Sequence, residues 1–89
     1  MKLSAAQAAL LLSMAKGDTL KSHRHLDGVK VYQLHRLDGS IAAMHRSTVE
    51  ALSKRGLIGS NHKFPVATYW LTEQGQTAIA ELAQDDWAG

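Results

Sequence analysis

Histidine, arginine and aspartate side chains are concentrated in residues 23–39, which read HRHLDGVKVYQLHRLDG. Side chains of these types can bind a metal ion, transfer protons in catalysis or bind the phosphates of a nucleic acid. The segment nearly repeats itself, because His-Arg and Leu-Asp-Gly each occur in residues 23–28 and again in residues 35–39. The segment is therefore a metal site, a catalytic site, a nucleic-acid surface, or a pair of β-turns with basic flanks.

The two Asp-Gly pairs favour the β-turns. Asp27-Gly28 and Asp38-Gly39 are both flanked by alternating residues, which is a strong short-range signal for a hairpin with a two-residue type I′ turn. We therefore predict a three-stranded meander with strands at about residues 19–26, 29–37 and 40–44. In this interpretation both aspartates are explained by turn formation.

Two-residue turns set the register of the predicted meander and thereby the composition of its two faces. One face carries Leu20, Val29 and Val31 and is the expected core face. The other is a possible basic binding face, which carries Lys21, His23, His25, Lys30, Tyr32 and Arg36. His23 and His35 then lie on opposite faces, although a one-residue bulge at either turn would change this assignment.

Neither metal binding nor catalysis is favoured by this arrangement. Zinc requires three or four ligands, and no carboxylate joins His23 and His25 on their face. Ser47 lies close to His45 in sequence, but Ser47 is explained as a helix cap, and the chain has no glycine-rich phosphate loop. We expect no enzymatic activity, no metal and no cofactor.

The length and composition of the chain are those of one small domain. The 89 residues include no cysteine and carry a formal net charge of +2, which is compatible with a polyanionic partner. We expect a single domain at residues 1–84 with a C-terminal tail at 85–89. No segment approaches membrane-spanning length. The N-terminus superficially resembles a signal peptide, but Ser4 and Gln7 form a helix-start signature instead, so we expect a cytoplasmic protein.

Three helices and a second hairpin are predicted around the meander. The first helix spans Ala5 to about Lys16, with an alanine-rich inward face, and ends at Gly17. The second follows Ser47 as its cap, with Glu50 closing the capping box. A hairpin at residues 57–71 follows, and Thr72 then caps a last helix that ends near Ala83.

The second half of the chain, residues 47–82, resembles winged-helix DNA-binding proteins of the bacterial MarR, ArsR and PadR type. In that family a helix of the form T-V-x-x-L-x-x-x-G-L-I leads into a β-wing, which returns through Y-x-L-T-x-x-G. The matching positions are Thr48, Val49, Leu52, Gly56, Leu57, Ile58, Tyr69, Leu71, Thr72 and Gly75. The resemblance implies an α+β winged helix with three helices, the meander between the first and second, and a hairpin wing before the last. The chain departs from the family where a further helix normally precedes the recognition helix.

The resemblance implies that this is a small protein that binds double-stranded DNA at specific sequences. It would act as a repressor-type regulator of a bacterial or mobile-element operon. The resemblance also suggests a homodimer through the first and last helices. The implied recognition-helix contacts are Arg46, Ser47, Thr48, Glu50, Ala51, Lys54 and Arg55. The implied wing contacts are Asn61, His62 and Lys63. Arginine can bind guanine in a bidentate manner, so Arg46 is the candidate for base reading. Lys54, Arg55 and Lys63 are the candidates for phosphate contacts.

Two alternatives stay open at this point. The basic face of the meander could itself be the binding surface. A winged-helix scaffold can also serve as a protein-interaction module, for example a phage-encoded inhibitor that does not bind DNA, because a fold does not determine a function.

Overall fold

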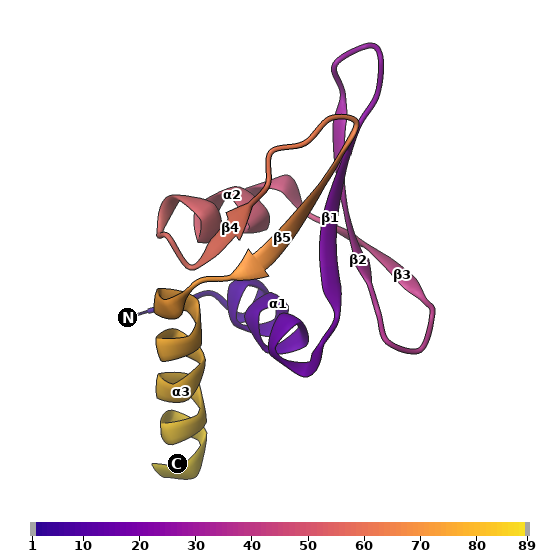
Figure 1. Cartoon of the computed structure of the whole chain (residues 1–89). Helices are drawn as coiled ribbons and strands as arrows, with labels where there is room; N and C mark the ends of the chain where they lie inside the picture. Colours follow the sequence, from indigo (N-terminus) through magenta and orange to yellow (C-terminus); the bar gives the residue numbers. More distant parts are fainter. Residues whose placement is uncertain (1, 89) are drawn as a thin grey trace.

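The structure is a computed structural model that describes the backbone of residues 2–88 and the side chains of residues 2–82. Its elements follow the order α1 (Ala5–Lys16), β1 (Thr19–Arg24), β2 (Lys30–His35), β3 (Ile41–Met44), α2 (Arg46–Lys54), β4 (Ile58–Ser60), β5 (Val66–Leu71) and α3 (Glu73–Ala88). Over the described residues the chain is an α+β fold with three helices and a five-stranded antiparallel sheet (Figure 1). This confirms the predicted class and the predicted order of elements.

The five strands are arranged in the order β3-β2-β1-β5-β4. The predicted meander therefore forms one side of the sheet, and the predicted hairpin forms the other side. The two parts are joined by β1 and β5, with Lys21 opposite Thr68 and His23 opposite Val66. The first strand in the sequence thus occupies the centre of the sheet.

The loops of the meander contain three residues each, so the prediction of two-residue turns is wrong. His25 donates to Val29 O at 2.8 Å, and Gly28 donates back to His25 O at 2.9 Å. Gly28 has a φ of +89°, which matches a type I turn followed by a left-handed glycine bulge. The second loop has the same pattern, with Gly39 at a φ of +91°. The Asp-Gly pairs mark the turns correctly, but each turn contains one more residue than predicted.

The additional loop residue moves the register by one and exchanges the two faces of β2. Tyr32 lies opposite Ser22 rather than His23, and Tyr32 and Leu34 are buried. Val29 and Val31, which were predicted to be in the core, are 54 % and 37 % exposed. The helices cover the face that carries Tyr32 and Leu34. These side chains are larger than those of Val29 and Val31, so this register removes more apolar area from water.

The same change in register brings His23 and His35 onto one face of the sheet, and the prediction of opposite faces is wrong. Their ring centroids lie 6.2 Å apart with an interplanar angle of 35°. The Nε2 atoms of both rings are buried, and neither has a hydrogen-bond partner among the described residues. This histidine pair lies on the face opposite to Tyr32.

Helix α1 begins and ends as predicted but buries a different face. The Ser4 side chain accepts from Gln7 N, and the Gln7 side chain accepts from Ser4 N, so the capping box is confirmed. The buried residues are Leu10, Leu11 and Met14, whereas the alanine-rich face that was predicted to point inward is largely exposed. The reason is that the longer side chains remove more apolar area from water than alanine does.

Helix α2 starts earlier than predicted. Its N-cap is His45, which makes no side-chain capping bond, and Ser47 lies inside the helix. The predicted Ser47 capping box is therefore wrong, and Glu50 pairs with Arg46 instead. Val49 and Leu52 are buried as expected.

The start of helix α3 confirms its predicted cap, because Gly75 N donates to Thr72 Oγ1 at 3.1 Å. The helix continues to Ala88, beyond the predicted end near Ala83. Residues 85–88 of the predicted tail are therefore helical in their backbone, and Gly89 lies outside the described residues.

Candidate nucleic-acid interface

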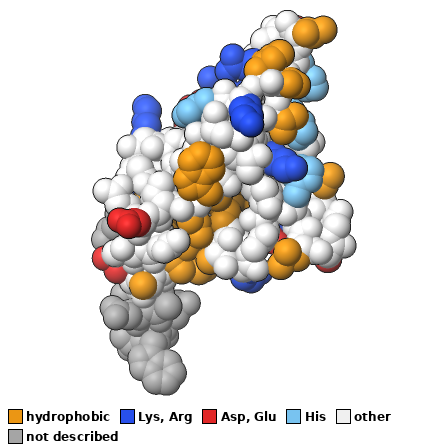
Figure 2. All heavy atoms as spheres, viewed as in Figure 1, with side chains coloured by type: hydrophobic (Ala, Val, Ile, Leu, Met, Phe, Trp, Pro, Cys, Tyr) orange, Lys and Arg blue, Asp and Glu red, His pale blue; other side chains and the backbone are white. Residues whose placement is uncertain are grey.

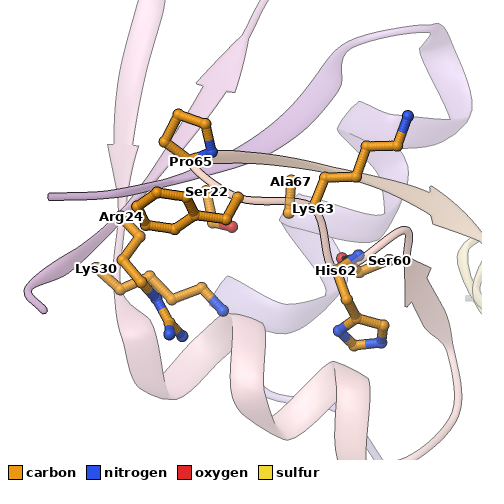
Figure 3. A pocket seen from close by; sticks show the side chains of 9 residues that line it. Ser22, Arg24, Lys30, Ser60, His62, Lys63, Pro65 and Ala67 are labelled. Atoms are coloured by element: carbon orange, nitrogen blue, oxygen red, sulfur yellow. Dashed lines mark hydrogen bonds between the residues drawn. The ribbon is translucent and has the colours of Figure 1, made fainter. Parts of the chain in front are cut away.

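Helix α2, the β4–β5 loop and the β1–β2 hairpin contribute the residues that line two neighbouring hollows. The first, here called the hairpin cavity, has a volume of about 150 Å³. It is lined by Ser22, Arg24, Lys30, Ser60, His62, Lys63, Phe64, Pro65 and Ala67 (Figure 3). The second, here called the α2 groove, is lined by Lys30, Tyr32, Glu50, Ser53, Ile58, Gly59, Ser60, His62 and Tyr69. The two hollows share Lys30, Ser60 and His62 and therefore lie side by side, and together they are called the depression here.

The β4–β5 loop that borders the hairpin cavity is held by its own polar groups. Asn61 Oδ1 accepts hydrogen bonds from Lys63 N at 3.1 Å and from Thr68 N at 3.2 Å. His62 N donates to Ser60 Oγ at 3.0 Å, and His62 adopts a φ of +54°. The predicted tip residues Asn61, His62 and Lys63 are all exposed, so the loop presents them in a defined conformation.

The exposed side of α2 carries most of the predicted helix contacts. Arg46, Ser47, Glu50 and Lys54 are exposed, whereas Thr48 and Ala51 are half-buried. Thr48 lies in a hollow beside α1, away from the α2 groove. The structure therefore brings only part of the predicted set to the surface that faces the groove.

Arg46 and Glu50 form an ion pair on this surface, with Arg46 Nε donating to Glu50 Oε1 at 2.6 Å. The hydrogen bond from Arg46 lowers the pKa of the Glu50 carboxyl, and the carboxylate in turn raises the pKa of the guanidinium. The side chains remain 76 % and 47 % exposed. Water screens an exposed pair of this kind and makes it weak, so Arg46 can exchange Glu50 for an external anion.

Arg55, the last of the predicted helix contacts, lies elsewhere. Its Nη1 donates to Lys2 O at 3.0 Å, and the side chain lines a separate hollow with Glu73 and Glu81 of α3. The structure does not bring Arg55 together with the β4–β5 loop.

The six residues predicted to form one basic sheet face are divided between two faces, so that grouping is wrong. Lys21 and His23 lie on the open face, whereas Lys30 and Tyr32 lie on the face that the helices cover. Lys30 Nζ sits 5.3 Å from the centroid of the Tyr32 ring. Arg36 lies near α1, and His25 is exposed beyond the end of β1. The register change described above is the cause.

The same register change reveals a site residue that sequence reasoning did not select. Arg24 is not among the residues that the sequence predicts for a site. In the structure Arg24 pairs with Lys30 across the hairpin, and both side chains line the hairpin cavity. The glycine that follows each aspartate is compatible with a three-residue loop, and that loop would have placed Arg24 beside Lys30.

Positive charge gathers around these hollows. Figure 2 shows lysine, arginine and histidine side chains concentrated over the β1–β2 hairpin and the neighbouring β4–β5 loop. Asp27 and Asp38 at the loop tips each accept a backbone hydrogen bond in their own loop. Hydrogen bonds from Ser40 lower the pKa of Asp38. These carboxylates are thus engaged locally and lie at the tips of the loops.

The floor of the α2 groove is aromatic and sensitive to alkaline pH. Tyr32 and Tyr69 are buried, with ring centroids 6.2 Å apart, and burial raises the pKa of the Tyr32 phenol. A group with a raised pKa in the folded state contributes stability below its unfolded pKa of about 10, and this stability is lost as the pH rises further. We therefore expect the urea concentration at the midpoint of unfolding to decrease as the pH is raised from about 9 to about 11. The Tyr32→Phe variant should show a smaller fall; an equal fall in both proteins would contradict this assignment.

No family model, curated protein or solved structure matches the chain in any of the three comparisons. Within residues 2–88 no helix is long and apolar enough to cross a membrane. The described side chains contain no group of three or more histidine, aspartate or glutamate residues that could hold a metal ion. A functional proposal therefore depends on the geometry and charge of the chain itself.

Proposed function

We propose that this protein binds double-stranded DNA at specific sequences and acts as a small repressor-type transcriptional regulator. The observation that carries the proposal is the position of three elements around one depression. These elements are the exposed side of α2, the β4–β5 loop with His62 and Lys63, and the β1–β2 hairpin with Arg24 and Lys30. A helix beside a basic hairpin loop suits a major groove and its flanking phosphates.

The topology supports a winged-helix arrangement. Helix α2 is followed directly by the β4–β5 hairpin, which pairs with β1, and α3 follows the hairpin. In this proposal α2 is the recognition helix and β4–β5 is the wing. The β2–β3 pair occupies the position where winged-helix proteins usually have the first helix of the helix-turn-helix, so a sheet would support the recognition helix.

The proposed roles of individual residues follow from their exposure and chemistry. Arg46, at the start of α2, is positioned to read a base edge after it leaves Glu50. Lys54 and Lys63 are exposed cations suited to phosphates. A homodimer through α1 and α3 remains part of the proposal, and it would place two recognition helices on a palindromic site.

A second candidate function, a protein-interaction module, is favoured by the open face of the sheet. This face carries Val31, Ile41 and Trp70, which are 37 %, 57 % and 49 % exposed. Apolar side chains that are exposed on one face of a sheet can contribute to a surface that binds another protein. The DNA-binding experiment below separates the two functions.

Duplex DNA binding is expected to be steeply dependent on salt. After selection of bound sequences from a random duplex pool, fluorescence anisotropy of the enriched duplex should give a log–log slope of about −0.9 for each phosphate contact. Lys63→Ala should weaken binding to all sequences and reduce the magnitude of this slope by about 1, whereas Arg46→Ala should relax sequence preference.

The matched control is Lys21→Ala, because Lys21 lies on the open face of the sheet and outside both hollows. This variant should bind DNA like the parent protein. If no sequence is enriched and no duplex binds even at low salt, DNA binding is excluded and the protein-interaction function becomes the working proposal.

A further inference from the structure

The hairpin cavity combines features that are found together in phosphate-binding sites. The cavity lies between the β1–β2 loop and the β4–β5 loop. Arg24 N at the end of β1 donates to Pro65 O in the β4–β5 loop at 2.8 Å, and this hydrogen bond joins the two parts of the chain. The cavity volume of about 150 Å³ is at least ten times the roughly 10–15 Å³ that a single water needs. The cavity therefore has room for a tetrahedral oxyanion.

The basic side chains that line the cavity come from different parts of the chain. Figure 3 shows the Arg24, Lys30 and His62 side chains extending to the same side, toward α2, whereas Lys63 extends in the opposite direction. Arg24 pairs with Lys30 across the hairpin, so two positively charged side chains lie on neighbouring strands beside the cavity. Arginine can donate two parallel hydrogen bonds to a phosphate, and lysine adds a point charge.

Hydroxyl groups complete the lining of the cavity. Ser22 is 2 % exposed and lines the cavity, and it is the buried polar residue among the described side chains. Ser60 also lines the cavity, and its Oγ accepts from His62 N. Because this oxygen acts as an acceptor within the loop, the hydroxyl hydrogen can donate to an anion.

We infer that the hairpin cavity is a phosphate-binding site formed by Arg24, Lys30 and His62, and that it takes a backbone phosphate of the duplex. The inference rests on the proposed function and extends it, since it makes the β1–β2 hairpin a second DNA-contacting element beside the β4–β5 loop. The phosphate then sits between the two loops, at the end of the depression that leads to α2.

The chain offers a closely matched control for this site. Lys21 and Lys30 lie on the same hairpin and are both half-buried, but they lie on opposite faces of the sheet. Lys30 lines the hairpin cavity and Lys21 does not. Comparison of Lys30→Ala with Lys21→Ala therefore separates the loss of a site residue from the loss of one positive charge.

The first measurement uses inorganic phosphate and does not require DNA. A phosphate titration followed by amide NMR should give saturable shifts at Ser22, Ser60 and His62 in the parent protein and in Lys21→Ala. The shifts should be lost in the Arg24→Ala/Lys30→Ala double variant, whose unperturbed spectrum elsewhere would show that it is folded. If phosphate produces no saturable shift at these amides, there is no phosphate site in the cavity and the inference is wrong.

The second measurement uses the enriched duplex. Arg24→Ala and Lys30→Ala should each weaken binding about tenfold and reduce the magnitude of the salt slope by about 1, while Lys21→Ala should leave the slope unchanged. If phosphate binds but no duplex does, the proposed function fails and the anion site remains. If both bind and the two variants keep the parental slope, the site takes free phosphate, and its assignment to the DNA backbone is overturned.

Discussion

Replacement of Gly75 by alanine is expected to lower the free energy of unfolding by about 1–3 kcal/mol, because the added methyl group overpacks the contact between α3 and Leu57. The methyl group would lie 2.1 Å from the backbone oxygen of Leu57, so either α3 or the start of β4 has to move. That oxygen also accepts the Thr72 N–H at 3.1 Å, which joins the two segments. Overpacking of this kind costs about 1–3 kcal/mol and occasionally more. Urea denaturation followed by circular dichroism measures the change.

The sign of this effect is opposite to that expected from helix propensity. Alanine is favoured over glycine by about 1 kcal/mol inside a helix, and Gly75 lies in the first turn of α3. Gln76→Ala, at the exposed neighbouring position, serves as the control and should change stability by less than about 0.5 kcal/mol. If Gly75→Ala is as stable as the parent protein, the described approach of α3 to Leu57 is incorrect.

A Leu52→Ala variant is expected to lose about 2–5 kcal/mol of stability, because removal of a buried leucine side chain leaves a cavity. Leu52 is 0 % exposed and lies on the inward side of α2. Since α2 has only nine residues, its position depends mainly on the packing of Leu52 and Val49. DNA binding should also weaken in this variant at temperatures where it remains folded, since the proposed recognition helix is less well held.

The control for this variant is Leu26→Ala, which removes the same side chain from a position that is 99 % exposed at the tip of the β1–β2 hairpin. Its stability should remain within about 0.5 kcal/mol of the parent value. Equal losses in the two variants would show that the hairpin tip is packed and that the three-residue loop has been assigned incorrectly. Thermal and urea unfolding of the two variants side by side provide the measurement.

Features that depend on a few neighbouring residues were predictable from the sequence. The capping box of Ser4 and Gln7, the left-handed glycine at position 17 and the Thr72 cap all occur as predicted, because each motif satisfies its own backbone groups locally. The order of helices and strands was predictable for the same reason.

Features that depend on packing between elements were not predictable in the same way. The Asp-Gly pairs are compatible with loops of two or three residues, and the choice is made by which residues of β2 the helices cover. With three-residue loops, Tyr32 and Leu34 become buried. The same competition explains α1, where Leu10, Leu11 and Met14 replace the alanine face.

The candidate site contains some residues that were predictable from the sequence and others that were not. The exposed residues of the β4–β5 loop were located by turn chemistry alone. Arg24 was missed because its neighbour across the hairpin depends on the register, which places Lys30 beside it. Arg55 was included because helix periodicity does not reveal the neighbouring Lys2 carbonyl. The grouping of Lys21 with Lys30 failed for the same reason as the assignment of His23 and His35.

The central position of β1 has a consequence for the order of folding. β1 lies between β2, its neighbour in sequence, and β5, which follows much later in the chain. During synthesis the meander can form early, yet one edge of β1 stays unpaired until β5 has been made. Contacts between segments that are distant in sequence slow folding, and unpaired edges promote aggregation. Folding of the nascent chain is therefore completed only when its C-terminal third has emerged from the ribosome.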